Sequence, residues 1–327
     1  MRLVSDIGEL ELIRRIAERL EAPPPGEVWA GDDTAVLRPA PEHELFTTDL
    51  MVEGVDFELS YRTGGDVGYK ALAVNVSDVA AMGGVPRHAL ITMGLRAETT
   101  LAIVDGIVEG LAGAAKDYGV ALVGGDVSQA GELSLGVAMT GAAQRPVLRR
   151  GARPGDALVV TGRLGGAAGG LAVLRRGARL ATGHAAALVR RQLRPEPRLA
   201  AGGILASYGA TAMIDLSDGL AVDLGHLCSS SGAGCVVETA AIPVDESLEA
   251  MAKDLDLDPL QTALTGGEDF ELLAALPPDA VSRAEREVRA AGVALTEIGR
   301  VTEGGCYIGD KALDEIRREG WEHLRSR

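Results

Sequence analysis

Two acidic turns near the N-terminus carry side chains suited to binding a divalent metal ion. The first is GDDT at residues 31–34, before an apolar run at 35–37, and the second is TTD at residues 47–49, after Leu45 and Phe46. We expect both apolar runs to be strands, whose ends hold side chains in fixed directions. Carboxylate and hydroxyl oxygens suit Mg²⁺, which shares its shell readily with phosphates. Either turn alone is more often structural, because Asp, Gly and Thr are common turn residues.

The same pattern, an acid beside a short apolar segment, recurs along the chain. Residues 120–123 predict a strand that runs into GGD, residues 213–215 one that runs into DLSDG, and TGGED precedes a strand predicted at 270–274. A helix predicted at 67–82, capped by Asp66, carries one further acid, and Ser217 and Asp218 are predicted to cap a helix that begins near Leu220. Collected, the candidate acids are Asp33, Asp49, Asp78, Asp126, Asp215, Asp218 and Glu268.

So many carboxylates in one place would repel one another, by about 4 kcal/mol for a pair at about 4 Å and an effective dielectric near 20. Divalent cations relieve that repulsion and in turn bind phosphates, which the acids alone would exclude. Phosphoryl transfer depends mainly on positioning and charge neutralisation, so an acidic, metal-rich site is sufficient for it.

A basic, turn-rich stretch at residues 142–155 is predicted to separate two domains. It includes RRGARPGD, and its four arginines are as consistent with phosphate binding as with a solvated linker. A length of 327 residues also favours two domains. We place the boundary between residues 1–148 and 149–327.

The predicted elements alternate between helix and strand, which indicates an α+β or α/β fold. Helices are predicted at 5–20, 101–118, 184–192, 197–208 and 279–291, and strands at 88–95, 133–141, 157–161 and 294–301. The glycine-rich segment 162–166 lacks the ribose-binding acid of a dinucleotide fold.

Composition and motifs exclude several classes of protein. A net charge of −15 disfavours nucleic acid and anionic membranes as partners. The four lysines do not form a P-loop, and there is no protein-kinase catalytic loop, catalytic triad or zinc motif. Cys228, Cys235 and Cys306 have neither metal-ligand spacing nor an obvious disulfide pattern, and no secretory signal or membrane-length apolar run is present. We therefore expect a soluble, cytoplasmic protein.

Taken together, the motifs resemble the thiamine-monophosphate kinase family, within the aminoimidazole-ribonucleotide-synthetase-like superfamily. They occur in the family's order along nearly the whole chain and are GDDTAVL, TTDLMVEGVDF, YKALAVNVSDVAAMGGVP, GGD, RRGARPGD, LRPEPR, IDLSDGL, LTGGEDFEL and GWEHL. The resemblance implies ATP-dependent phosphorylation of thiamine monophosphate to thiamine diphosphate, with several Mg²⁺ ions and direct in-line transfer. It also implies two domains, each a mixed β-sheet covered by helices, and a homodimer in which the N-terminal sheets pair. The N-terminal domain would bind ATP and Mg²⁺, and the C-terminal domain would complete the site for nucleotide and thiamine phosphate.

The resemblance also implies a role for each residue that matches a family motif. Asp33, Asp49, Asp78 and Asp126 would act catalytically through bound Mg²⁺. The full set of metal ligands would be Asp33, Thr47, Thr48, Asp49, Asp78, Asp126, Asp215 and Asp218. Nucleotide contacts would come from Gly125, Asp126, Arg149 and Ser217, and contacts to the thiamine moiety from Asp56, Glu268 and Trp321.

Two positions depart from the family pattern, and two other functions stay open. Asp56 stands where the family often has His, and Val127 stands where Thr is common. One alternative is another ATP-using synthetase of the superfamily, such as aminoimidazole-ribonucleotide synthetase, against which GGEDFEL and GWEHL argue. The other is a protein that binds Mg²⁺ and nucleotide without turnover.

Overall fold

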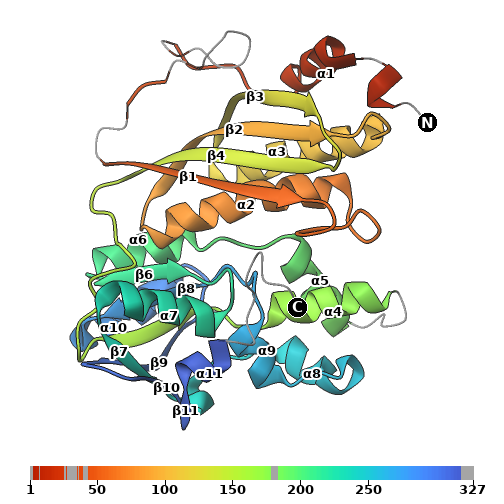
Figure 1. The fold of residues 1–327 in the computed structure, drawn as a ribbon. Coiled ribbons are helices and arrows are strands. Elements are labelled where there is room, and N and C mark those ends of the chain that lie inside the picture. Colours follow the sequence, from red (N-terminus) through yellow and green to blue (C-terminus); the bar gives the residue numbers. More distant parts are fainter. Residues whose placement is uncertain are drawn as a thin grey trace. The chain divides into compact units, whose positions relative to one another are not determined.

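The computed structural model describes residues 3–6, 8–25, 27, 35, 37–39, 43–177 and 183–317. The chain divides into two compact units, one formed by Met1–Val79 and Val85–Gln144, the other by Ala80–Gly84 and Arg145–Arg327. Each unit has its own β-sheet covered by helices (Figure 1), which confirms the predicted fold class. The roles assigned above to residues 1–148 and 149–327 stay predictions.

A mixed, four-stranded sheet is the core of the first unit. Its order is β1-β4-β2-β3, and only β2 and β3 run parallel. The strands are β1 (His43–Val52), β2 (Val85–Leu95), β3 (Ala121–Gln129) and β4 (Ser134–Ala143). β1 continues past Asp49 and β3 past Asp126, so our placement of these two acids at strand ends was wrong. Side chains alternate between the two faces of a strand, and neighbouring residues of these motifs therefore point in opposite directions.

Helices α2 (Gly64–Ala81) and α3 (Leu101–Tyr118) cover one face of this sheet (Figure 1). Their backbones approach closely at glycines: a Cβ on Gly68 would lie 2.0 Å from the Ile107 carbonyl oxygen, and one on Gly110 would lie 2.1 Å from the Gly65 carbonyl oxygen. α2 begins two residues before Asp66, and the Thr63 hydroxyl accepts from the Asp66 amide at 3.2 Å. The predicted helix at 101–118 is confirmed. The short segments η1 (Val4–Asp6) and α1 (Gly8–Ala17) replace the single helix predicted at 5–20.

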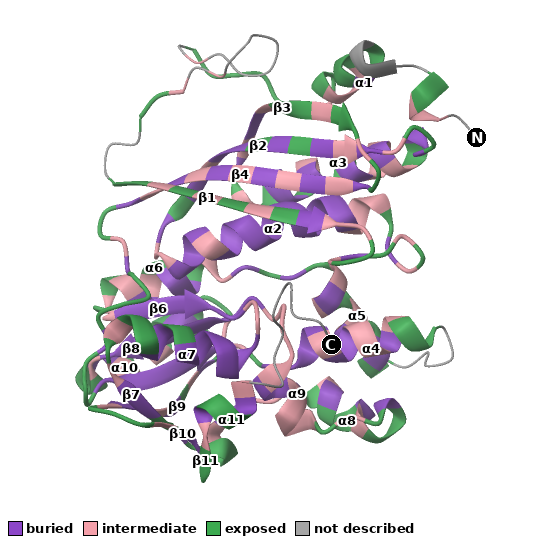
Figure 2. Cartoon of the chain, in the orientation of Figure 1, coloured by how far each residue is buried: buried purple, intermediate pink, exposed green. Residues whose placement is uncertain are grey.

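The opposite face of the same sheet carries exposed apolar side chains. Phe46 and Leu50 are 74% and 63% exposed on β1, and Leu90 is 43% exposed on β2. The register places all three on the side away from the helices, whereas Met51, Ile91 and Val137 are buried beneath the helices. Bands of exposed and less exposed residues follow one another along β1 in Figure 2.

The second unit contains a seven-stranded sheet of order β11-β10-β7-β9-β5-β8-β6. Every residue of β5, β6 and β8 is buried, although β6 is the last strand of the sheet; Figure 2 shows β6 in the colour of buried residues. The strands are β5 (Ala157–Thr161), β6 (Ala212–Asp215), β7 (Gly234–Val237), β8 (Leu272–Leu276), β9 (Leu295–Thr302), β10 (Cys306–Ile308) and β11 (Lys311–Ala312).

Two apolar layers form the core of this unit, one on each face of its sheet. Leu158 and Val160 pack in the layer of α7 and α11, whereas Val159 between them packs in the layer of α6 and α10. A third cluster joins α4, α5 and α8. The helical segments are α4 (Gly166–Arg176), α5 (Gly183–Leu193), α6 (Leu199–Ser207), α7 (Leu220–Ser231), η2 (Thr239–Ala241), α8 (Glu246–Leu255), α9 (Pro259–Thr265), α10 (Pro278–Ala290) and α11 (Leu313–Arg317). Within the described ranges, the helices fall short of the length and apolar character that a bilayer span requires.

Candidate active site

An acidic group forms in the first unit where β1 faces the end of α2. The Thr47 hydroxyl donates a hydrogen bond to the Asp78 carboxylate, which joins the strand to the last turns of the helix. Asp49 follows Thr47 by two residues, so both side chains lie on the helix-covered face. Burial, together with the charges of Asp78 and Asp56, raises the pKa of Asp49 to about 6. Three of the predicted metal ligands therefore meet in one partly buried, electronegative place.

Asp56 belongs to the same neighbourhood through the turn that follows β1. Its carboxylate accepts a hydrogen bond from the Val52 amide at 2.8 Å and closes that turn. Its charge contributes to the raised pKa of Asp49. The predicted contact of Asp56 with the thiamine moiety stays a prediction.

The other predicted ligands of the first unit lie elsewhere on its sheet. Thr48 points to the face opposite Thr47, where its hydroxyl donates to the Val137 carbonyl at 2.9 Å. Asp126 is exposed, and its register partner Thr92 lies on that same open face. Since β4 and β2 lie between β1 and β3, the Cα atoms of Asp49 and Asp126 are about 14 Å apart at the usual strand spacing. Within one chain, these two carboxylates cannot bind the same ion directly.

The predicted roles of three further residues stay predictions. Gly125 lies in β3 beside Asp126, and a Cβ there would lie 1.8 Å from the Ile91 carbonyl oxygen, so glycine is required for strand packing whatever its role toward a nucleotide. Asp33 and Trp321 lie outside the described residues.

A second acidic group, in the second unit, surrounds the loop between β6 and α7. Asp215 ends β6, as predicted, and it is buried, while Ser217 and Asp218 are partly exposed. The capping prediction was wrong: α7 begins after Gly219 without a side-chain cap. Asp223 performs this function from inside the helix, because its Oδ2 accepts from the amides of Asp218 and Gly219, each at 3.1 Å.

Asp223 is a residue that our sequence reasoning missed. It is 2% exposed, and burial with the charges of Asp215 and Asp218 raises the pKa of its carboxyl to about 8. The signal was an acid in the first turn of a helix whose flanking residues are apolar. Such a side chain faces inward and requires a buried partner.

Replacing Asp223 by Ala is expected to leave two loop amides without their acceptor, which costs about 1–3 kcal/mol of unfolding free energy. It should also lower kcat/KM for phosphoryl transfer, since the loop carries Ser217 and Asp218. Asp223→Asn keeps a carbonyl oxygen in place and should retain most of the activity. Because the folded-state pKa of about 8 lies above the unfolded value near 3.9, this variant should also be at least as stable as the wild type at neutral pH. Urea unfolding and steady-state kinetics of the two variants test this, and equal effects of Ala and Asn would contradict a positioning role.

The segment that carries Glu268 is held in an unusual backbone conformation. Glu268 and Phe270 have φ angles of 69° and 50°, a region that non-glycine residues adopt only under constraint. The constraint is pairing with the β6–α7 loop: the Glu268 amide donates to the Ser217 carbonyl at 2.8 Å and the Phe270 amide to the Leu216 carbonyl at 2.9 Å. The two predicted contact residues, Ser217 and Glu268, are therefore adjacent. The Glu268 carboxylate also accepts from Gln192 Nε2 at 2.6 Å.

Two acids, the partly buried Asp269 and the buried Glu271, anchor this segment on either side of Phe270. Asp269 accepts from the amides of Gly165 at 2.6 Å and Ala167 at 3.1 Å, at the start of α4, while burial raises its pKa to about 7. Glu271 is 1% exposed and receives both arms of Arg198, at 2.7 and 2.6 Å, and the Thr161 hydroxyl at 2.6 Å. The sequence signal for both residues was a pair of acids immediately before the fully apolar strand β8.

Arg149, predicted to contact the nucleotide, is exposed in the segment before β5. Its carbonyl accepts from the Ser231 hydroxyl at 3.4 Å, at the end of α7. Its side chain is thus on the surface of the second unit.

The donors of both acidic groups fit Mg²⁺. They are hard oxygen ligands, and in the first unit burial and the carboxylates of Asp78 and Asp56 raise the pKa of Asp49, a charge that a bound cation would stabilise. Thr47, Asp49 and Asp78 would hold an ion in the first unit, and Asp215 and Asp218 would hold one in the second. Bound Mg²⁺ would neutralise the negative charge of the phosphates.

Comparisons with known proteins show which family the chain resembles. Residues 31–143 match the family described as AIR synthase related protein, N-terminal domain, and residues 153–310 match the corresponding C-terminal domain. The chain is 35% identical over 325 residues to the thiamine-monophosphate kinase of Aquifex aeolicus, covering 99% of this chain and all of the relative.

Two solved structures share the fold along almost the whole chain. Thiamine-monophosphate kinase from Stenotrophomonas maltophilia has a TM-score of 0.81 at 31% identity, covering 94% of this chain and 98% of the other. A structure described as "AaThiL complexed with AMPPCP and TMP" has a TM-score of 0.80 at 35% identity and covers 99% of each chain.

Proposed function

The chain belongs to the thiamine-monophosphate kinase family of AIR synthase related proteins, and from that premise we propose that it phosphorylates thiamine monophosphate to thiamine diphosphate with ATP. The observation that carries the proposal is the meeting of Thr47, Asp49 and Asp78 in a partly buried place, where burial and the neighbouring carboxylates raise the pKa of Asp49. A family member has been solved with AMPPCP, an ATP analogue, and TMP.

We propose direct, in-line transfer. An oxygen of the acceptor phosphate forms a new bond to the γ-phosphorus as the bond from that phosphorus to the β,γ-bridging oxygen breaks, and ADP leaves. The acceptor needs no general base, because a phosphate monoester with a second pKa near 6 is ionised at neutral pH. The protein therefore contributes position and charge rather than a covalent nucleophile.

Within this scheme, each predicted residue binds one part of the reaction complex: the metal ions, the nucleotide or the thiamine moiety. Thr47, Asp49 and Asp78, with Asp33, Thr48 and Asp126, would hold several Mg²⁺ ions that carry the phosphates, and Asp215 and Asp218 would do so in the second unit. Gly125, Arg149 and Ser217 would contact the nucleotide, and Asp56, Glu268 and Trp321 the thiamine moiety. The hydrogen bonds of Asp223, Asp269 and Glu271 support the placement of Ser217, Asp218 and Glu268.

An assay with ATP, Mg²⁺ and thiamine monophosphate tests the function. We expect ADP and thiamine diphosphate in equal amounts, and no thiamine diphosphate when Mg²⁺ is chelated. Failure to form product above background, with intact ATP binding, would support the silent-binder alternative. Turnover with the substrate of aminoimidazole-ribonucleotide synthetase, and none with thiamine monophosphate, would support the alternative that the chain is another synthetase of the superfamily.

For Arg149→Ala we expect a roughly tenfold higher KM for ATP with little change in kcat, because a guanidinium paired with a phosphate contributes about 1.5–3 kcal/mol. Arg145→Ala, in the same basic stretch, is the control and should leave the KM near the wild-type value. An unchanged KM for ATP in Arg149→Ala would indicate that the basic stretch is only a linker and does not bind the nucleotide.

We also propose that the chain is a homodimer that buries the open face of the first sheet, since an exposed cluster of Phe46, Leu50 and Leu90 marks an association surface. The double variant Phe46→Asp/Leu50→Asp should be monomeric in light scattering at concentrations where the wild type is dimeric. Val236→Asp places the same charge on an exposed apolar position of the second unit and should stay dimeric. A dimeric double variant would exclude this face.

A further inference from the structure

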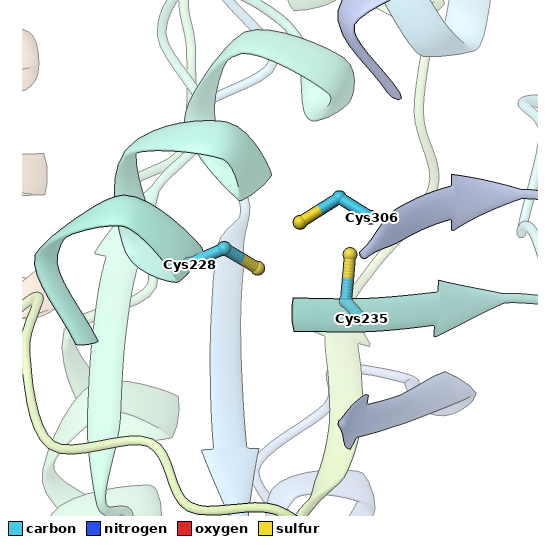
Figure 3. Close-up of side chains that lie close together, drawn as sticks. All are labelled: Cys228, Cys235 and Cys306. Carbon is cyan, nitrogen blue, oxygen red and sulfur yellow. The ribbon is translucent and has the colours of Figure 1, made fainter. Parts of the chain in front are cut away.

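Three cysteines, two of them seven residues apart and the third distant in the sequence, meet in the second unit. Cys228 lies on α7, Cys235 on β7 and Cys306 on β10, and the three sulfur atoms all lie within 4.8 Å of one another. Figure 3 shows the three sulfur atoms pointing toward a common centre, one from the helix and two from the paired strands. Cys235 and Cys306 are register partners in the parallel pair β7–β10, which fixes their separation.

A cavity opens beside the three thiols. It has a volume of about 320 Å³, and Cys228 and Cys306 both line it, together with Arg317 and Asp314. Cys235 is fully buried, and Cys306 is partly exposed. The cluster is therefore not sealed in the core: a small ion has an entry path, and a water molecule has room beside it.

We propose that Cys228, Cys235 and Cys306 bind one thiophilic divalent cation of the zinc class. Thiolate bonds to Zn²⁺ are about 2.3 Å long, so tetrahedral ligation places sulfur atoms about 3.8 Å apart. The observed spacing needs each sulfur to move by no more than about half an ångström, within the range of a cysteine χ1 adjustment. The fourth coordination position would face the cavity and take water.

Binding balances as an exchange of protons for the metal. Three S–H bonds break, three sulfur–metal bonds form, and three protons pass to solvent through the cavity. The complex then carries one net negative charge, and the cavity wall contains the Arg317 guanidinium, which also pairs with Asp314 at 3.5 Å. In the metal-free protein, the Cys228 thiol and burial raise the pKa of Cys235, and burial raises that of Cys306. These neutral thiols are poor nucleophiles, which disfavours disulfide exchange as the purpose of the cluster.

The expected consequence is local stabilisation rather than catalysis. α7 and β7 follow one another in the chain, whereas β10 comes about 70 residues later, and a metal bound to all three would fix β10, the strand next to the edge strand β11, against the helix. An ion that binds only the folded state stabilises it by RT ln(1 + L/Kd), where L is the free ion concentration, and so raises the Tm as that concentration rises. This role is independent of the Mg²⁺ sites proposed above, which consist of oxygen ligands.

The test uses the full chain, reduced and freed of metal by chelation, and titrated with Co²⁺ as a spectroscopic probe. We expect a sulfur-to-cobalt charge-transfer band that saturates at one ion per chain, is displaced by Zn²⁺, and is absent from Co²⁺ bound to carboxylates. X-ray absorption of the zinc form should show three sulfur neighbours. Zn²⁺ should also raise the Tm.

Cys306→Ser is the informative variant because Cys306 is the least buried of the three and its loss is least able to unfold the protein. It should weaken Co²⁺ affinity at least tenfold and abolish the Tm rise, while kinase activity with Mg²⁺ is retained. Ser229→Ala changes a neighbouring residue of the same cavity and should behave as the wild type. Wild-type protein that binds Co²⁺ without the charge-transfer band, or zinc with only oxygen and nitrogen neighbours, would overturn the proposal.

Discussion

Replacing Asp49 by Asn is expected to lower kcat for thiamine diphosphate formation by about 100-fold or more, and at the same time to stabilise the metal-free protein. The loss of rate follows from removing one charged group of a preorganised site. The gain in stability follows from relief of the repulsion and burial that raise the pKa of Asp49 to about 6. A purely structural residue would lose both activity and stability.

The stability gain has a defined pH dependence. The unfolded chain has an Asp pKa near 3.9 and the folded state one of about 6, so the folded state binds more protons between these values. The contribution of Asp49 to the wild-type free energy of unfolding therefore falls as the pH rises from about 4 to about 6. Above about pH 6 this contribution is constant. The advantage of Asp49→Asn should be near zero at pH 4 and reach on the order of 1–3 kcal/mol at pH 7.

Urea unfolding in the presence of a chelator measures this difference, and Mg²⁺ should stabilise the wild type more than the variant. Asp117→Asn removes the same charge from an exposed position of the same unit and should change neither rate nor stability. Near-normal turnover in Asp49→Asn would remove Asp49 from the site.

Arg198→Met is expected to cost about 3–5 kcal/mol of unfolding free energy, because it leaves the buried Glu271 carboxylate without its counter-ion. Glu271 is 1% exposed and accepts both arms of the guanidinium. Its neighbours, Asp269 and Glu268, occupy the constrained segment beside Ser217. We therefore expect the KM for thiamine monophosphate to rise as well.

Two further variants separate this effect from simple loss of an arginine. Arg198→Met/Glu271→Gln removes both charges and should recover most of the stability. Arg289→Met breaks the exposed pair with Glu285, which is 2.7 Å long, and should cost less than about 0.5 kcal/mol. If Arg198→Met is no more destabilising than Arg289→Met, the buried pair does not anchor the segment. The chemical denaturation midpoint of each variant gives the comparison.

Local sequence determined much of this molecule. The helix at 101–118 is specified by its apolar periodicity, by Thr100 at its start and by Gly119 at its end, all of which lie within one segment. The strand at 157–161 is specified in the same way by continuous apolar residues. The family likewise follows from short motifs in a fixed order, because each motif is local.

Only the tertiary structure decided which way the candidate side chains point and how far apart they lie. The motifs containing Asp49 and Asp126 looked alike, but both residues lie within strands, and register alone places one beneath the helices and the other on the open face. No local pattern encodes which strands lie between them. Asp269 and Glu271 were missed for a related reason: their partners are backbone amides, an arginine and a hydroxyl that lie about 70 to 110 residues away in the chain.

The cysteines show the same division most clearly. Their spacing in the sequence, seven residues and then seventy-one, matches no metal motif, and only the pairing of β7 with β10 beneath α7 brings the three sulfurs together. Sequence fixes which side chains are available and the local element that each belongs to. Long-range strand pairing decides which of them become neighbours, because it depends on the packing of the whole sheet rather than on any one segment.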